Sequence, residues 1–271
     1  MPELPEVETI VRELRPLIVG QRVADVEIVD VRLLDREDPD AFHQQVIGRQ
    51  VESIERRGKY VVLGLGGALV VLLHLRMTGR LIVNPTGAVG HVRAVFHFAD
   101  GLSLVFDDRR RLGTMRLAEA TDSVLARLGP DPLLEGFSPE VLGQRLAGHN
   151  IPVKAALLDQ HIISGLGNMY ADEALFRAGM HPLEMAGTLS ADHVTRLHRA
   201  IQSVLREAID GKGASVDSYV RPGGEPGTAH FAFKVAHRPG EACPGCGMPI
   251  SRVQIRKRGA YFCPQCQRLE S

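Results

Sequence analysis

The stretch CPGCGMPISRVQIRKRGAYFCPQC spans residues 243–266 and holds every cysteine of the chain. It contains two C-x2-C pairs separated by 16 residues, a spacing typical of a tetrahedral zinc site. Because no cysteine is left over, the predicted ion is structural rather than catalytic. A pair of disulfides or a redox pair is the alternative, which a reducing compartment disfavours. We expect a zinc-bound β-hairpin with the ligands Cys243, Cys246, Cys263 and Cys266.

The gap between the two pairs carries three consecutive basic residues, Arg256, Lys257 and Arg258. They fall where the hairpin would turn, so they favour contact with nucleic acid, although a solvated turn has the same composition. The whole chain has 32 basic and 32 acidic residues, which argues against a protein that coats nucleic acid nonspecifically. Residues 212–271 alone hold nine basic and four acidic residues, so the positive charge is local.

The length of 271 residues and the 44% hydrophobic content indicate one large domain or two ordinary ones with real cores. This composition excludes a disordered polyelectrolyte, a collagen-like fibre and a disulfide-dense scaffold. No apolar run reaches the roughly 18 residues of a membrane-spanning helix, and MPELPE has no signal-peptide character. We therefore expect a cytoplasmic protein without a membrane partner.

The first residues combine a helix start with an unusual amine. Val7, Ile10, Val11 and Leu14 follow a helical period and predict a helix over residues 5–16. Removal of Met1 would leave Pro2 with a secondary α-amine that titrates near neutral pH and can form an imine. Glu3 and Glu6 lie beside it as a general acid and an anchor. The simpler alternative is that these residues only start the helix.

From Val23 to about Leu117 the pattern predicts strands. Residues 60–65 and 68–75 form one hairpin around Gly66-Gly67, and residues 92–98 and 102–106 form another around Asp100-Gly101. Many short antiparallel strands indicate a β-sandwich.

Beyond Leu117 the period becomes helical. Ser138-Pro139 starts one helix, and further helices are expected over residues 154–160, 168–178 and 191–209. The segment Ser164-Gly165-Leu166-Gly167-Asn168 joins two of them, with Asn168 as the expected N-cap. Free N–H groups at such a helix start bind anions, so it could hold a DNA phosphate. An ordinary connection between helices is the alternative.

Taken together, MPELPEVET at residues 1–9, LRMTGRL at 75–81, DRRRLG at 108–113, SGLGNMYADEALF at 164–176 and the four-cysteine tail resemble the formamidopyrimidine-DNA glycosylase family. The resemblance covers essentially the whole chain. It implies an α+β fold with an N-terminal antiparallel β-sandwich and flanking helices, a helical helix–two-turn–helix domain and a zinc-finger β-hairpin. The implied domains are a catalytic β-sandwich at 1–120, a hinge at 121–135, a helix–two-turn–helix domain at 136–236 with a lesion loop at 211–236, and a zinc finger at 237–271.

The resemblance also implies roles for individual residues. Pro2 becomes the Schiff-base nucleophile, Glu3 the acid that assists sugar opening, and Glu6 a supporting residue. Lys59 matches the proton donor for β-elimination, and Arg258 the arginine tied to δ-elimination. The implied DNA contacts are Met77, Arg110 and Leu112, which fill the gap left by the extruded base, and His91, His149, Lys154 and Asn168.

The implied activity is that of a bifunctional DNA glycosylase and abasic-site lyase that excises oxidised purines from double-stranded DNA. The implied protein is a monomer in a bacterial-type, nucleoid-associated cytoplasmic setting, and one structural Zn²⁺ is its only cofactor. An endonuclease VIII-like enzyme for oxidised pyrimidines and a non-catalytic binder of damaged DNA are the alternatives.

Several positions depart from the family pattern. Leu112 stands where the purine-specific branch usually has Phe. The side chain that would insert between the bases, the wedge, is therefore smaller. In the loop over the damaged base, residues 228–231 replace an aromatic-led segment and Ala236-His237 replaces a Tyr-Gly pair. Residues 148–150 lack the usual basic cluster. Lesion preference is therefore less strongly implied than reaction type.

Overall fold

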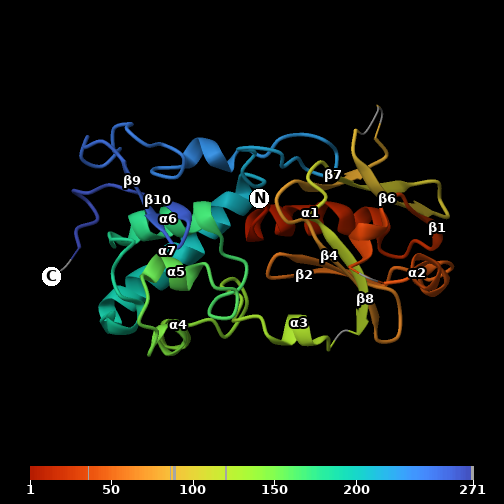
Figure 1. Cartoon of the computed structure of the whole chain (residues 1–271), viewed down its shortest axis with the longest axis horizontal. Helices are drawn as coiled ribbons and strands as arrows, with labels where there is room; N and C mark the ends of the chain where they lie inside the picture. The colour runs from red at the N-terminus through yellow and green to blue at the C-terminus, as the bar shows by residue number, and fades with distance from the viewer. Residues whose placement is uncertain (36, 86, 88–89, 120, 270–271) are drawn as a thin grey trace. The chain divides into compact units, whose positions relative to one another are not determined.

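The computed structural model of the chain describes residues 1–35, 37–85, 87, 90–119 and 121–269. The chain divides into two compact units (Figure 1). One unit comprises Met1–Ala126 and Ile209–His230, and the other comprises Arg127–Ala208 and Phe231–Ser271. The predicted lesion loop at 211–236 is thus split, since residues up to His230 belong with the first unit.

The first unit contains two four-stranded antiparallel sheets with the orders β1-β6-β7-β5 and β2-β3-β4-β8. Its strands are β1 (Val23–Ile28), β2 (Ser53–Arg57), β3 (Tyr60–Gly64), β4 (Leu69–His74), β5 (Gly79–Val83), β6 (Val92–Phe98), β7 (Ser103–Asp108) and β8 (Thr114–Glu119). Its helices are α1 (Leu4–Ile18), η1 (Val31–Leu34), α2 (Pro39–Val46) and α3 (Ser123–Ala126). Buried residues of both sheets and of α1 form one core, which confirms the predicted β-sandwich and both predicted hairpins.

Helix α1 forms as the sequence predicts. Val7, Ile10, Val11 and Leu14 are all buried in the core of the unit, and Glu3 and Glu6 form a capping box at the N-terminus. Such a box satisfies N–H groups that the first helical turn leaves unpaired. The helix therefore has a fixed start two residues after Pro2.

The prediction of strands alone from Val23 to Leu117 was wrong at two places, because η1 and α2 interrupt the run. Asp38 caps α2 by accepting the Ala41 N–H at 2.9 Å, and Pro39 follows at the first turn. Asp-Pro is a recognised helix start, so the signal was present in the sequence.

The second unit holds α4 (Pro139–Leu146), α5 (Val153–Leu157), α6 (Asn168–Ala178), η2 (Ala186–Thr188), most of α7 (Ala191–Asp210) and the antiparallel hairpin of β9 (Ser251–Ile255) and β10 (Arg258–Phe262). The residues of a short helix η3 (Ala229–Ala232) are divided between the two units, with the division after His230. Helix α5 ends earlier than predicted, since Asp159 accepts the His161 N–H at 2.9 Å in a turn that competes with the helix.

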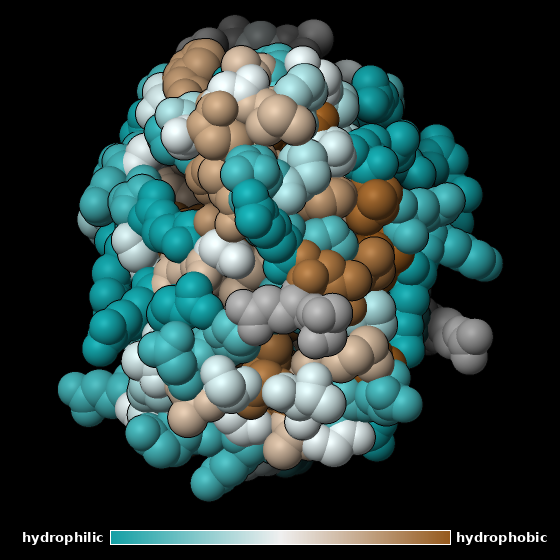
Figure 2. Space-filling model, turned by 90° about the vertical axis from the view of Figure 1, so that its left-hand side faces the viewer, coloured by the Kyte–Doolittle hydropathy of each residue, from teal (hydrophilic) through white to brown (hydrophobic). Residues whose placement is uncertain are grey.

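The described residues contain no helix that is long and apolar enough to cross a membrane. Figure 2 shows one face of the molecule, on which hydrophobic residues form a few patches among hydrophilic ones.

Candidate active site and nucleic-acid interface

The N-terminal segment is buried in the first unit. Pro2 is buried, and Glu3 is only 2% exposed. The Glu3 N–H donates to Glu6 Oε2 at 2.7 Å, and Glu6 Oε1 accepts the Ala214 N–H at 2.8 Å. The structure therefore brings the predicted residues Pro2, Glu3 and Glu6 together. It also shows that the buried Glu6 carboxylate links the residue after Pro2 to the start of the predicted lesion loop.

Lys59 lies in the two-residue turn between β2 and β3. Gly58 has a φ of +58°, a conformation that glycine adopts without strain. Arg56 donates to the Gly58 carbonyl at 3.3 Å and to Glu8 of α1 at 2.8 Å. The turn that carries Lys59 is thus tied to the helix that follows Pro2.

Met77 lies in a tight turn between β4 and β5. The Leu75 carbonyl accepts the Gly79 N–H at 2.9 Å, and a Cβ at Gly79 would lie 2.5 Å from that same oxygen. Only glycine fits there, which explains the Met-Thr-Gly order of the motif. The turn leaves Met77 partly exposed.

Arg110 and Leu112 lie in the loop after β7, and both are exposed. The buried Asp108 carboxylate accepts the N–H groups of Arg110 and Leu112 at 3.1 and 2.8 Å. The Thr78 hydroxyl donates to Asp108 and accepts the Arg110 N–H at 3.1 Å. Thr78, the neighbour of Met77, therefore joins the two turns that carry the predicted gap-filling residues.

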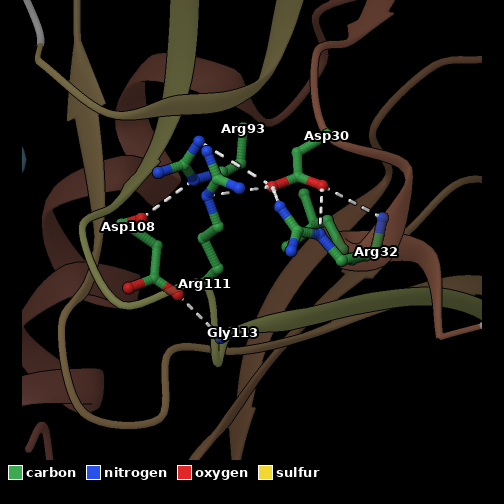
Figure 3. A pocket seen from close by; sticks show the side chains of 7 residues that line it. Asp30, Arg32, Arg93, Asp108, Arg111 and Gly113 are labelled. Atoms are coloured by element: carbon green, nitrogen blue, oxygen red, sulfur yellow. Dashed lines mark hydrogen bonds and ion pairs between the residues drawn. The ribbon is translucent and has the colours of Figure 1, made fainter.

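A cluster of charged residues supports the same loop. Figure 3 shows the Asp30 carboxylate among Arg32, Arg93 and Arg111. The Asp30 carboxylate oxygens lie 3.0 Å from Arg32 Nε, 3.8 Å from Arg93 Nη1 and 3.6 Å from Arg111 Nε. The hydrogen bond from Arg32 is the main reason that the pKa of Asp30 is lowered. Since Arg111 has a φ of +55°, its ion pair with Asp30 stabilises a backbone shape that arginine disfavours.

His91 is exposed just before β6. Its backbone N–H donates to Asp107 Oδ1 at 2.8 Å, and Arg80 Nε donates to Asp107 Oδ2 at 2.9 Å. A cavity of about 220 Å³ beside it is lined by Thr78, Arg80, His91, Asp107, Arg109, Asp217 and Ser218. Three of these lining residues can carry positive charge, which suits a contact with the DNA backbone.

Asn168 is the first residue of α6, and Gly167 is the N-cap, so the expected cap was wrong by one residue. Gln160 holds the preceding turn by accepting the Gly165 N–H and donating to the Leu166 carbonyl, both at 2.9 Å. Within the described part of the chain, the buried Asn168 Oδ1 has no hydrogen-bond partner. The phosphate contact predicted for Asn168 would use N–H donors, those of its side-chain amide and of the backbone at the positive end of α6, rather than this oxygen.

Lys154, another predicted DNA contact, is held by partners within its own unit. The side chain is fully buried, and Nζ donates to Asp172 Oδ1 at 2.6 Å and to the Gly259 carbonyl at 2.7 Å. The structure therefore shows Lys154 Nζ engaged within the protein, and the direct DNA contact implied by the resemblance stays a prediction. Lys154 instead ties α5 and α6 to β10, one residue after Arg258.

Two other predicted contacts are accessible in the second unit. His149 is exposed in the loop after α4, and its carbonyl accepts the Ile151 N–H at 2.9 Å. Arg258 is exposed at the start of β10. The turn residues before it, Arg256 and Lys257, have φ values of +45° and +66°, the signature of a type I′ hairpin turn.

The four cysteine Sγ atoms lie within 4.8 Å of one another. Tetrahedral zinc with Zn–S bonds of about 2.3 Å requires S–S distances of roughly 3.8 Å. Cys243 and Cys266 are 3.9 Å apart, and Cys246 and Cys263 are 3.4 Å apart, so the residues fit Zn²⁺ and are too distant for disulfides. This four-cysteine cluster is a structural zinc site.

Purified protein is expected to contain about one zinc ion per chain by elemental analysis. Cys263→Ser should abolish zinc binding and unfold the hairpin, because the metal supplies folding energy to so small a module. Loss of hydrogen-exchange protection in β9 and β10 would report the unfolding. Zinc retained at full occupancy in this variant would contradict the four-ligand assignment.

The sequence reasoning missed the buried carboxylates that organise the site. Besides Asp108 and Asp172, Glu173 accepts the N–H groups of Val235 and Ala236, both at 2.8 Å, and so fixes the chain just before the zinc finger. The available signal was the acidic pair Asp172-Glu173 among the apolar residues in the middle of the helix predicted over residues 168–178.

Comparison with known families gives matches along most of the chain. Residues 1–115 match the formamidopyrimidine-DNA glycosylase N-terminal domain, and residues 128–219 match the H2TH domain of the same enzymes. Residues 240–269 match a zinc finger found in FPG and IleRS.

Individual relatives agree with these family matches. The formamidopyrimidine-DNA glycosylase of Symbiobacterium thermophilum is 44% identical, over 98% of this chain and 89% of its own. The crystal structure of the MutM (FPG) protein from Thermus thermophilus superposes with a TM-score of 0.90 at 38% identity and covers all of both chains. A Lactococcus lactis FPG variant in complex with DNA containing Fapy-dG gives a TM-score of 0.91 at 32% identity, over 99% of this chain and 100% of that chain.

Proposed function

The chain belongs to the formamidopyrimidine-DNA glycosylase family, and we propose that it is a bifunctional DNA glycosylase and abasic-site lyase of base excision repair. Its substrates are oxidised purines, 8-oxoguanine and formamidopyrimidines, in double-stranded DNA. The observation that carries the proposal is the buried arrangement of Pro2, Glu3 and Glu6 at the positive end of α1.

The damaged nucleotide must leave the base stack before the chemistry can begin, at a cost of a few kcal/mol. Met77, Arg110 and Leu112 fill the gap, and their two turns are joined through Thr78 and Asp108. The apolar side chains replace lost stacking, and the Arg110 guanidinium donates hydrogen bonds to the acceptors of the cytosine left behind.

The amine of Pro2, freed by removal of Met1, attacks C1′ of the deoxyribose. Glu3 assists opening of the sugar ring, the glycosidic bond breaks, and the base departs with the bonding electron pair. The iminium ion that forms acidifies C2′. Loss of a C2′ proton then expels the 3′ phosphate, and a second elimination expels the 5′ phosphate.

Lys59 and Arg258 assist these eliminations. Lys59 transfers a proton during β-elimination and binds a phosphate, and Arg258 supports δ-elimination from the finger. Asn168, His91 and His149 bind the DNA backbone. Zinc, held by the four cysteines, shapes the finger and takes no part in bond making.

We further propose that the protein acts as a monomer in the bacterial cytoplasm, associated with the nucleoid. Relatives such as that of Symbiobacterium thermophilum are bacterial.

Borohydride trapping tests the function. Incubation of the protein with a duplex containing 8-oxoguanine opposite cytosine should give a covalent adduct, since borohydride reduces the imine. The controls are the same assay with a duplex containing thymine glycol and with undamaged DNA. A stronger adduct with thymine glycol would assign the pyrimidine activity instead, and binding without any adduct would indicate a non-catalytic damage binder.

Leu112→Phe tests the smaller wedge. An aromatic ring at this exposed position would stack on the neighbouring base, a contact worth about 1 kcal/mol or more, so binding to a duplex with an abasic-site analogue should tighten about fivefold. Leu134→Phe, at an exposed position of the second unit, is the matched control. Equal affinity of both variants and the wild type would show that residue 112 does not enter the stack.

A further inference from the structure

We propose that His74 is a positioning residue that sets both the turn carrying Met77 and the turn carrying Lys59. This inference rests on the proposed function, which gives those two residues their roles. His74 is the last residue of β4, directly before the Met77 turn, and it is 7% exposed.

His74 fixes the Met77 turn through one ring nitrogen. Nδ1 accepts the backbone N–H of Arg76 at 3.0 Å. Arg76 has a φ of +50°, a conformation that costs a non-glycine residue free energy. The hydrogen bond offsets that cost and holds the backbone immediately before Met77.

The same ring contacts the hairpin of Lys59. His74 pairs with Tyr60 across β3 and β4, and the two ring centroids lie 4.6 Å apart at an interplanar angle of 87°. Edge-to-face packing of this kind is favourable and directional. Since Tyr60 follows Lys59 directly, the His74 ring supports the end of the turn from which Lys59 extends.

The surroundings keep His74 neutral, as an acceptor at Nδ1 requires. Burial, together with the positive charges of Arg76 and Lys59, lowers the pKa of His74 to about 3. With Nδ1 accepting, the ring proton is on Nε2. His74 therefore keeps one hydrogen-bonding pattern across the physiological pH range and is not a proton carrier.

Two substitutions separate the two contacts. In His74→Asn, the side-chain oxygen can accept the N–H of residue 76 in an Asx turn, but the ring that meets Tyr60 is lost. In His74→Phe, the ring remains and the acceptor is lost. Each variant thus keeps one contact and removes the other.

Two readouts on DNA report the two turns. Fluorescence of 2-aminopurine beside an abasic-site analogue reports insertion of Met77, and single-turnover cleavage of a preformed abasic site at saturating enzyme reports the step assisted by Lys59. His74→Phe should weaken the fluorescence-detected binding about tenfold and leave the saturated cleavage rate within about twofold. His74→Asn should show the reverse.

This crossed pattern supports the proposal, and every other pattern overturns it. Two variants that match the wild type would mean that His74 sets neither turn. Two variants that lose both readouts together, in step with a lowered Tm, would mean that His74 only stabilises the fold. Wild-type protein that neither inserts nor cleaves would refute the proposed function instead, which keeps the two failures distinct.

Discussion

Pro2→Gly should abolish the adduct trapped by borohydride and lower strand cleavage at abasic sites by about three orders of magnitude or more. A secondary amine such as that of proline forms an iminium ion, which is cationic without further protonation and withdraws electrons from C2′. Glycine forms a neutral imine that must first gain a proton. Glycine also removes the ring that restricts the N-terminus, so the amine is less well placed for attack.

The matched control is Pro5→Ala. Pro5 lies in the first turn of α1 and is buried as Pro2 is, but its substitution leaves the N-terminal amine unchanged. It should trap DNA as the wild type does, with only a change in stability. Mass spectrometry of the trapped wild-type complex should place the DNA on a peptide that begins with Pro2. A DNA-modified peptide containing Lys59 instead would move the nucleophile to that lysine.

Features encoded by neighbouring residues could be predicted from the sequence. Helix α1, the hairpin of β3 and β4, the start of α4 and the zinc site each depend on a local period, a cap or a fixed ligand spacing. Helix α2 was missed although Asp38-Pro39 signals it, because the surrounding strand pattern was extended across it.

The partners of buried charges could not be predicted, because they come together only through the fold. Nothing near Lys154 in the sequence shows that Asp172, eighteen positions later, would neutralise it, or that Gly259 would accept a second hydrogen bond. The same holds for Thr78 and Asp108, which lie 30 positions apart in the chain. A resemblance transfers a residue's identity and cannot show whether its side chain reaches the solvent.

Lys154→Met should destabilise the second unit by about 3 kcal/mol, because it leaves the Asp172 carboxyl buried without its cation. The loss should grow with pH. Burial raises the pKa of Asp172 to about 7 even beside Lys154, and loss of that cation would raise it further. The folded variant then holds a proton that the unfolded chain releases, so stability falls as pH rises from about 4 through the folded-state pKa. Hydrogen exchange in α6 and β10 measures the stability of the second unit at each pH without assuming that both units unfold together.

A second substitution identifies the cause. Lys154→Met combined with Asp172→Asn removes the buried charge, so much of the stability should return and the added pH dependence should disappear. Lys234→Met, at an exposed lysine of the same unit, should change neither the stability of the unit nor its pH dependence. DNA cleavage distinguishes a role of Lys154 in stability from a role in placing Arg258. The double variant still lacks the donor to the Gly259 carbonyl. Its δ-elimination, assisted by Arg258, should therefore remain slower than in the wild type although the fold is restored. Full recovery of δ-elimination in the double variant would show that Lys154 stabilises the unit without placing Arg258.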